Sequence, residues 1–335
     1  MSVLTSTTLL GAGQNLSGSL EVSALECRHD TLDPDTNVTD SRLLFTGPSP
    51  FGWHRYESFL RCPSQYGWSY GANPLPIYDE GGALVPPSQK RDRNDARPLV
   101  LGTLVHLGLA HHYAHLKARL ADTTTDLYSP MDAMAALTNA ESADAPPEGA
   151  ATWRECGEVA AEVVAKYLAR YASERIKPLH VEEVFILDVE GAPITMRVDL
   201  VAEDSAGRVY FIDHKTTGRI TNNHAKFYGI SGQFLAYTYA GRLTFGDRFA
   251  GVMLNLLQCG DPIKFERPQM PPSPGLLAAF PTTVKRAWAQ IQDLAGTEPC
   301  AWPKHPREHT CWTRYGPCKH YDACRLGLTG KKVDP

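Results

Sequence analysis

The chain has 335 residues and carries 33 Lys and Arg against 37 Asp and Glu, which gives a formal net charge of -4. Apolar residues make up 43% of the sequence, and at this length they allow a sizeable core and argue against global disorder. The low charge density excludes a protein that coats nucleic acid by bulk attraction, but it does not exclude an enzyme with a locally charged groove.

The N-terminal residues MSVLTSTTLLGAGQNL have neither a basic start nor a sustained apolar run, so we expect no signal peptide. No segment of the sequence approaches the ~18 consecutive apolar residues that a membrane span requires. We therefore expect a cytoplasmic protein, of a bacterium or of a phage-infected host. In that reducing compartment, clustered cysteines are more often metal ligands than disulfides.

The first part of the chain, residues 1–48, is rich in Ser, Thr, Gly and Asp, and six acids but only one base lie between Glu21 and Asp40. This composition predicts an acidic arm that is mobile or loosely docked. The next segment, Phe51–Tyr70, contains seven aromatic residues, and we expect it to fold against the body of the protein.

The remaining elements predict an α/β core. Helical spacing of apolar residues indicates helices at 99–120 and 152–174, with a weakly patterned stretch at 122–149 between them. The elements that follow are expected to be strands at 182–189, 194–202 and 209–215, with turns at 191–193 and 204–207, then a helix at 231–242, a strand at 249–257 and a helix at 276–294. Helices followed by a meander, a helix and a strand indicate a sheet with a helical flank.

We therefore divide the chain into four parts. They are the arm (1–48), a helical flank (49–178), a core (179–297) and a cysteine-rich segment (298–335). Residues 301–335 carry seven Lys and Arg against three acids, so the positive charge of the protein gathers in the last part. A basic segment beside an acidic site is typical of a groove that follows a phosphate backbone.

Two carboxylates and a lysine fall in the predicted strands. Asp213 and Lys215 follow an apolar run, and their side chains alternate to the same face of the strand. Asp199 lies in the preceding strand, so pairing of the two strands would bring the three groups together. Oxygen ligands of this kind suit Mg²⁺ or Mn²⁺, and a neighbouring lysine can orient a water molecule or neutralise developing charge. Alternatively, Asp213 and Lys215 form only a surface ion pair.

These residues resemble the RecB-like branch of the PD-(D/E)xK nuclease superfamily. Asp199 matches the first metal-binding acid of that family, and Asp213-His214-Lys215 matches its D/E-x-K motif. The resemblance implies that the backbone carbonyl of the middle residue, His214, also binds the metal, and that Lys215 is catalytic.

Two further motifs extend the resemblance. Gly102-Thr-Leu-Val-His106 is similar to the G-x-x-x-H motif of the family, whose histidine is a metal ligand, although His106 alone would be read as a packed histidine. Gln233-x-x-x-Tyr237 is similar to the Q-x-x-x-Y motif, and this spacing places both side chains on one helical face. The resemblance implies that they position DNA. Glu183 is a weaker candidate for a further acid near the metal, or simply a charge at a strand edge.

Four cysteines form a second constellation. Cys311, Cys318 and Cys324 lie in a loop-like C-terminal segment and are one ligand short of a closed site. The fourth ligand is either Cys300, which would complete a zinc knuckle, or Cys62, far upstream. The Cys62-Pro…Tyr stretch resembles the iron–sulfur nucleases of the AddB and CRISPR-associated RecB-like exonuclease type, in which one cysteine before the core and three after it hold a [4Fe–4S] cluster.

The resemblance covers residues 50–327 and implies an α/β PD-(D/E)xK core with a central mixed sheet, a helical flank and an iron–sulfur segment. It implies a Mg²⁺- or Mn²⁺-dependent exonuclease acting on single-stranded or frayed DNA ends, in recombination and repair or in phage or CRISPR-type DNA processing. The alternatives are a non-catalytic DNA-binding or assembly subunit and a structure-specific endonuclease. Three aromatic residues of the last segment are expected either to stack on unpaired bases or to pack around the cluster: Trp302, Trp312 and Tyr315.

Overall fold

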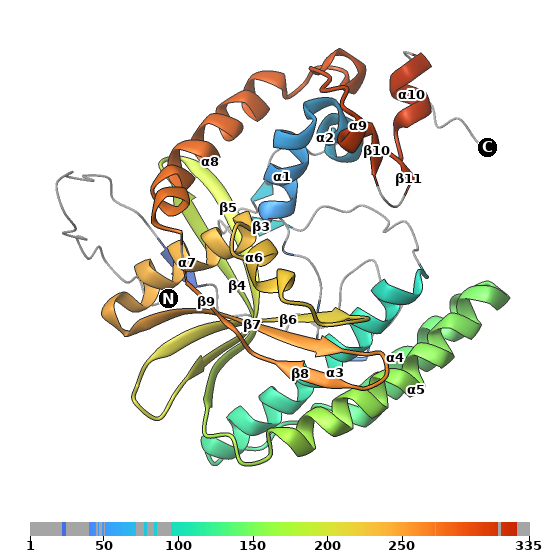
Figure 1. Cartoon of the computed structure of the whole chain (residues 1–335), viewed down its shortest axis with the longest axis vertical. Coiled ribbons are helices and arrows are strands. Elements are labelled where there is room, and N and C mark those ends of the chain that lie inside the picture. Colours follow the sequence, from blue (N-terminus) through green and yellow to red (C-terminus); the bar gives the residue numbers. More distant parts are fainter. Residues whose placement is uncertain are drawn as a thin grey trace.

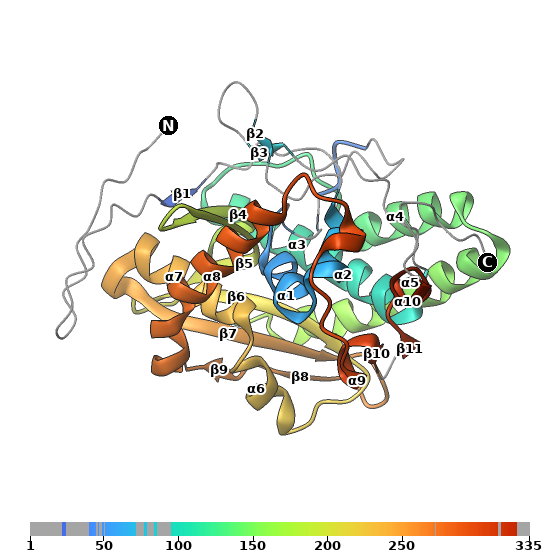
Figure 2. The ribbon, with the colours of Figure 1, turned by 90° about the horizontal axis from the view of Figure 1, so that it is seen from above.

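A mixed sheet of seven strands forms the centre of the protein, and helices cover both of its faces (Figures 1 and 2). The structure is a computed structural model that describes residues 22–24, 40–44, 46, 49, 51–71, 77–78, 84–85, 95–271, 273–313 and 316–326. The sheet has the order β1-β4-β5-β6-β7-β8, with β9 also paired to β7. Its strands are β1 (Val22–Ala24), β4 (Lys177–Val189), β5 (Ala192–Glu203), β6 (Val209–Thr217), β7 (Phe249–Gln258), β8 (Lys264–Glu266) and β9 (Gln269–Met270).

The predicted meander forms, and its turns set its register. β4 and β5 are antiparallel and joined at Glu190 and Gly191, which both have positive φ, as a two-residue hairpin turn requires. This turn lies one residue earlier than the sequence indicated. β5 and β6 are also antiparallel, whereas β6 and β7 are parallel because a helical crossover joins them.

Two hydrophobic layers enclose the sheet. On one face, α3 (Arg97–Leu120) and α5 (Pro147–Arg170) pack on residues such as Leu200 and Ile212. On the other face, α1 (Trp53–Arg61), α7 (Gly232–Phe245) and α8 (Pro274–Leu294) pack on residues such as Val198 and Phe211. The central mixed sheet expected from the sequence is therefore present, but the helices of 49–178 lie on both faces rather than forming one flank.

The structure contains a helix that the sequence analysis missed. α4 (Pro130–Asp144) lies in the stretch expected to be weakly patterned, and it packs against α3 and α5. Ser129 caps its first turn by accepting a hydrogen bond from the backbone N–H of Asp132 at 3.2 Å. The Ser-Pro-x-Asp start was a readable helix signal. It was overlooked because only a few small or medium apolar residues of the helix are buried.

The described parts of the N-terminal arm contact the body of the protein. β1 pairs with β4, and Leu43 is buried against the helical layer. The backbone N–H of Leu44 donates to Nε2 of the buried His111 at 3.1 Å, and the hydroxyl of Tyr128 donates to Asp40 at 2.7 Å. The rest of the predicted arm lies outside the described residues.

The aromatic segment folds against the body, as expected. It forms α1 and α2 (Pro63–Tyr70), with Phe51, Tyr56 and Tyr66 in the core. The C-terminal segment reaches this pair of helices through Trp302, whose ring stacks on Tyr66 with a centroid separation of 5.7 Å.

The remaining short elements are β2 (Ile77–Tyr78), β3 (Leu84–Val85), α6 (Asn223–Tyr228), α9 (Glu308–Cys311), β10 (Trp312–Thr313), β11 (Gly316–Pro317), α10 (Tyr321–Leu326) and 3₁₀ turns at Gly246–Arg248 and Pro299–Ala301. Within the described part of the chain, no helix is long and apolar enough to span a bilayer.

Candidate active site

A cleft opens where β5 and β6 part. The β5–β6 pairing ends at Leu200 and Ile212, and the next residues beyond it are Asp199 and Asp213. The backbone N–H of His214 donates to Asp199 Oδ2 at 2.7 Å, which replaces the ladder hydrogen bond lost at this point. The end of the pairing therefore places both carboxylates at the mouth of the cleft.

The D-x-K residues and the α7 motif form one hydrogen-bonded cluster. Lys215 Nζ lies 2.6 Å from Asp213 Oδ2, while Gln233 donates to Asp213 Oδ1 at 3.2 Å. Gln233 also donates to the hydroxyl of Tyr237 at 2.9 Å, and that hydroxyl donates to the backbone carbonyl of Arg197 at 2.6 Å. The helix spacing read from the sequence thus brings both α7 side chains to the cluster around Asp213.

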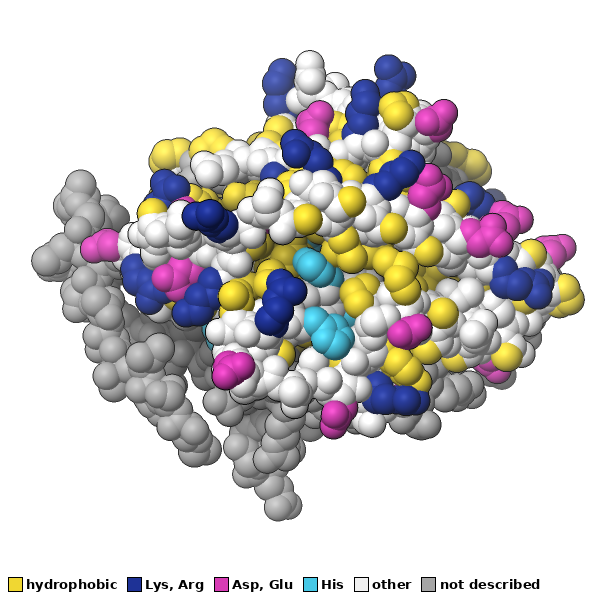
Figure 3. All heavy atoms as spheres, turned by 90° about the horizontal axis from the view of Figure 1, so that it is seen from below, with side chains coloured by type: hydrophobic (Ala, Val, Ile, Leu, Met, Phe, Trp, Pro, Cys, Tyr) yellow, Lys and Arg dark blue, Asp and Glu magenta, His cyan; other side chains and the backbone are white. Residues whose placement is uncertain are grey.

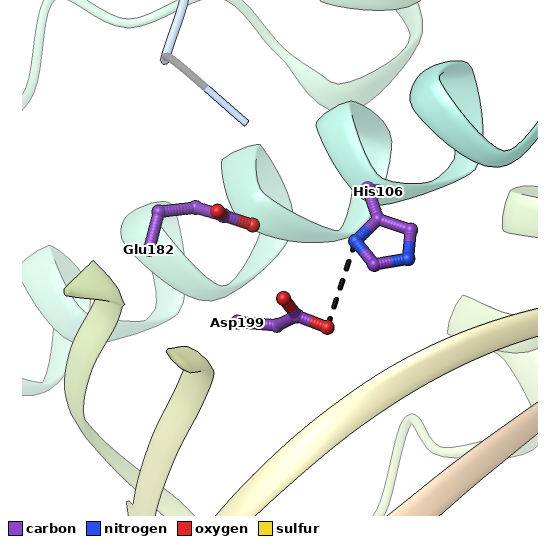
Figure 4. Close-up of side chains that lie close together, drawn as sticks. All are labelled: His106, Glu182 and Asp199. Carbon is purple, nitrogen blue, oxygen red and sulfur yellow. Dashed lines mark ion pairs between the residues drawn. The ribbon is translucent and has the colours of Figure 1, made fainter. Parts of the chain in front are cut away.

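A histidine and two carboxylates complete the site on the other side of the cleft (Figure 4). His106 comes from α3, Asp199 from β5 and Glu182 from β4, and ligand atoms of all three lie within 4.8 Å of one another. His106 Nδ1 is 3.5 Å from Asp199 Oδ2. Gly102, one turn before His106, faces Thr216 of β6, and a Cβ added there would lie 3.4 Å from Thr216 Oγ1.

The further acid whose carboxylate lies beside His106 and Asp199 is Glu182, the neighbour of the predicted Glu183. Glu183 lies next to His180, with Oε2 3.4 Å from His180 Nδ1. Between the pairs Val181–Leu200 and Glu183–Val198, the β4–β5 register sets Glu182 opposite Asp199. The correct turn, at Glu190 and Gly191, was the sequence signal for this register, because a hairpin turn determines which residues face each other.

The buried acids of the cluster repel one another, and this repulsion affects their pKa values. Burial and the negative charge of Asp199 raise the pKa of Glu182 well above its usual range, and burial raises the pKa of Asp213 although Lys215 opposes this. Burial alone would raise the pKa of Asp199, but its interactions with His106 and Lys215 and the hydrogen bond from the backbone N–H of His214 lower it. A divalent cation would relieve the repulsion among these carboxylates.

The donor set fits such a cation. Two carboxylates and an imidazole are within reach of one ion, and oxygen-rich sites of this kind suit Mg²⁺ or Mn²⁺. The buried Asp213 also lines the cleft, where its Oδ2 contacts Lys215 Nζ. The cleft has a volume of about 590 Å³ and is also lined by Trp53 and Leu99.

The ring of His214 points away from Asp213, into a buried polar network on the α3 side of the sheet. Nδ1 of His214 accepts a hydrogen bond from Asn255 at 2.8 Å, and Asn255 donates to the Tyr167 hydroxyl at 3.0 Å. Tyr113 stacks on the His214 ring at a centroid separation of 6.0 Å and shares a 2.7 Å hydrogen bond with Tyr167. Burial lowers the pKa of His214 to about 3, so the ring is neutral.

Arg267 closes this network, and we expect its loss to destabilise the fold. Its guanidinium is paired with Glu174 and donates to Asn255 Oδ1 at 3.1 Å, with only 9% of the side chain exposed. Arg267→Met should lower the free energy of unfolding by about 3 kcal/mol, because it removes the donor of the buried Asn255 and Tyr167 and leaves the half-buried Glu174 without its cation. Arg248→Met is the matched control, since Arg248 and Glu203 form an exposed pair that is worth less than about 1 kcal/mol. Urea unfolding measures both, and equal effects would contradict a stabilising role for the network.

The four cysteines proposed as one site come together in the structure. Cys62, Cys311, Cys318 and Cys324 line one cavity of about 290 Å³, and Cys300 is not among its lining residues. His320 stacks on Trp68 and so holds the C-terminal segment against α2.

The sulfur atoms are not tightly bunched. Among the described residues, no three cysteine Sγ atoms lie within 4.8 Å of one another, and no disulfide joins the described cysteines. Cys156 and Cys259 lie elsewhere, each directed at a backbone carbonyl, and Cys27 is outside the described residues. Trp302 is buried and Trp312 is 59% exposed, while Tyr315 is outside the described residues.

A separate hollow lies at the C-terminal end of α3. It has a volume of about 520 Å³ and is lined by His112, His115 and Arg119. Figure 3 shows the face on that side, with a hollow that has histidine and basic side chains at its edge. None of the predicted site residues lines this hollow.

Comparison with known proteins provides a family match. The sequence pattern of the PD-(D/E)XK nuclease superfamily matches residues 51–325. A structural search matches the crystal structure of a candidate exonuclease from Eubacterium rectale, with 13% sequence identity and a TM-score of 0.42 over 73% of this chain and 80% of that chain. A search of curated proteins finds no significant match.

Proposed function

The chain belongs to the PD-(D/E)XK nuclease superfamily, and we propose that it is a Mg²⁺- or Mn²⁺-dependent deoxyribonuclease of the RecB-like branch, an exonuclease acting on single-stranded or frayed DNA ends. The observation that carries the proposal is the meeting of Asp199, Asp213 and Lys215 at one open cleft, with Gln233 and Tyr237 from α7 and His106 from α3. The proposed setting is recombination and repair, or phage or CRISPR-type DNA processing.

The cation would be held by His106, Glu182, Asp199, Asp213 and the backbone carbonyl of His214. When bound, it supplies positive charge that polarises the scissile phosphate and lowers the pKa of an attacking water. The closeness of the His106, Glu182 and Asp199 donor atoms supports the first three as ligands. Asp213 is the candidate to share the ion with Asp199, because the two acids lie directly beyond the last β5–β6 pair and line the same cleft.

Lys215 has the position of the group that orients the nucleophile. Its ammonium remains charged, because the carboxylates of Asp213 and Asp199 raise its pKa despite its burial. From a site 2.6 Å from Asp213, it can hold a water molecule by hydrogen bonding and stabilise charge on the phosphate. Gln233 anchors Asp213 from the α7 side and is itself held by the Tyr237 hydroxyl, so the acid enters the reaction in one orientation.

An iron–sulfur cluster of the [4Fe–4S] type, bound by Cys62, Cys311, Cys318 and Cys324, is the second part of the proposal. The meeting of Cys62 with the three C-terminal cysteines at one cavity supports a shared site. A tetrahedral zinc site is the alternative. It would crosslink α1–α2 to the C-terminal segment.

One assay tests the nuclease proposal. End-labelled linear DNA and closed circular DNA, each single- and double-stranded, are incubated with the protein and Mn²⁺, with EDTA as the control. We expect stepwise loss of nucleotides from single-stranded and frayed ends, no cleavage of closed circles, and no reaction in EDTA. Cleavage of closed circles would indicate a structure-specific endonuclease and contradict the exonuclease proposal. Binding without any cleavage would indicate a non-catalytic subunit.

A further inference from the structure

The short helix α6 and the turn that follows it present two exposed apolar side chains beside the candidate active site. Phe227 is 67% exposed and Ile230 is 68% exposed, the two highest values among the exposed large hydrophobic side chains of the described residues. They lie between β6, which carries Asp213 and Lys215, and α7, which begins at Gly232 (Figure 1). Exposed apolar side chains next to a functional cleft are candidates for binding.

A ladder of aromatic rings links Phe227 to the site. The centroid separations are 5.2 Å from Phe227 to Tyr228, 5.5 Å from Tyr228 to Phe234 and 6.1 Å from Phe234 to Tyr237. Lys215 Nζ lies 6.0 Å from the centroid of the Tyr228 ring. Phe227, the outermost ring, is therefore the sequence neighbour of Tyr228, whose ring contacts the proposed catalytic lysine, Lys215.

Between Asp213 and Asp247, the chain segment that contains α6 carries only basic charge. Residues 214–246 contain four Lys and Arg and no Asp or Glu, in a chain whose net charge is -4. Arg219 and Lys226 are exposed on either side of the helix start, and neither forms an ion pair with a described residue. This charge is complementary to a phosphate backbone, whereas a contact between two copies of the same surface would set these cations against each other.

We propose that Arg219, Lys226, Phe227 and Ile230, here called the α6 rim, bind an unpaired DNA strand as it enters the cleft. Phe227 stacks on a base, Ile230 covers the edge of the same base, and the two cations contact the flanking phosphates. A base inside a duplex is already stacked on its neighbours and cannot offer its face to Phe227, so the rim selects unpaired strands. This inference rests on the proposed nuclease function and identifies the residues that would select its substrate.

Binding of fluorescent oligonucleotides in EDTA tests the α6 rim without cleavage. Phe227→Ala should weaken binding of a single-stranded oligonucleotide about tenfold and leave blunt duplex binding unchanged, because loss of one base–aromatic contact has this size. Phe227→Trp should restore the affinity. Leu120→Ala is the matched control, since Leu120 is 56% exposed at the far end of α3.

A second probe separates stacking from general attraction. An oligonucleotide of the same length with abasic sites keeps its phosphates but offers no base to Phe227. It should bind the wild-type protein about as weakly as the normal oligonucleotide binds Phe227→Ala, and the substitution should have no further effect on it. Equal losses with both oligonucleotides would overturn the stacking contact.

The outcomes distinguish this inference from the function on which it rests. If the wild-type protein degrades DNA but Phe227→Ala retains both single-strand affinity and kcat/KM, the inference is wrong and the nuclease proposal stands. If the wild-type protein neither binds nor cleaves any DNA, the nuclease proposal itself fails. A change of oligomeric state in Phe227→Ala, with unchanged DNA affinity, would make the α6 rim a contact between copies and would also overturn the inference.

Discussion

Replacement of Lys215 by Ala is expected to lower the rate of metal-dependent DNA hydrolysis by at least about a thousandfold. The reason is local, because Lys215 is the described cation that contacts Asp213, and its ammonium lies where it can orient a water molecule. Initial rates on end-labelled single-stranded DNA with Mn²⁺ measure the effect, and circular dichroism shows whether the fold is retained. Lys285→Ala is the control, since Lys285 pairs with Glu190 on the surface.

Binding of Mn²⁺ separates the roles within this cluster. Lys215→Ala should still bind the ion, because it removes a positive charge and no metal ligand. Asp199→Asn should lose both binding and hydrolysis, because Asp199 lies within ligand distance of His106 and Glu182. An active Lys215→Ala variant, or an Asp199→Asn variant that binds Mn²⁺ as well as the wild type, would contradict the proposed roles.

The second large effect is expected at the cysteine cavity. Cys318→Ser should abolish the brown colour and the absorption near ~400 nm that an iron–sulfur cluster produces. It should also lower the free energy of unfolding by several kcal/mol, on the order of a lost structural metal site, because the cluster would tie α2 to a segment some 250 residues later. Anaerobic purification, iron and sulfide analysis and thermal unfolding measure these effects.

Cys259→Ser provides the matched comparison. Cys259 is partly buried, and its thiol donates to the backbone carbonyl of Leu257 away from the cavity. This variant should keep the cluster and unfold within about 1 kcal/mol of the wild type. One equivalent of zinc without iron in the wild-type protein would instead indicate a zinc site, and a metal-free protein would show that the four cysteines bind neither.

Much of the candidate site was readable from local patterns. Asp213 and Lys215 share a strand face, and Gln233 and Tyr237 share a helix face, because side-chain direction follows from the period of each element. The pairing of Cys62 with the C-terminal cysteines was not readable from spacing alone. It depended on a family resemblance, and the structure brings the four residues to one cavity.

The errors of the sequence analysis have physical causes. Glu183 was singled out from its place in a predicted strand, whereas the β4–β5 register sets its neighbour Glu182 opposite Asp199. The helix α4 was missed because its buried face is small, although Ser129 and Asp132 mark its start. The buried network around Arg267 has no local pattern, since its partners come from α3, α5, β7 and the segment that follows β8.

By itself, the sequence determined the α/β class, the meander and the residue types of the site, because these depend on periodicity and on chemistry within short segments. Only the tertiary structure decided where β5 and β6 part, which acid joins His106, and how the exposed rings of α6 lie beside Lys215. Those features depend on register and on packing between segments distant in sequence. They are selected by the free energy of the whole core, which no short stretch of the chain encodes alone.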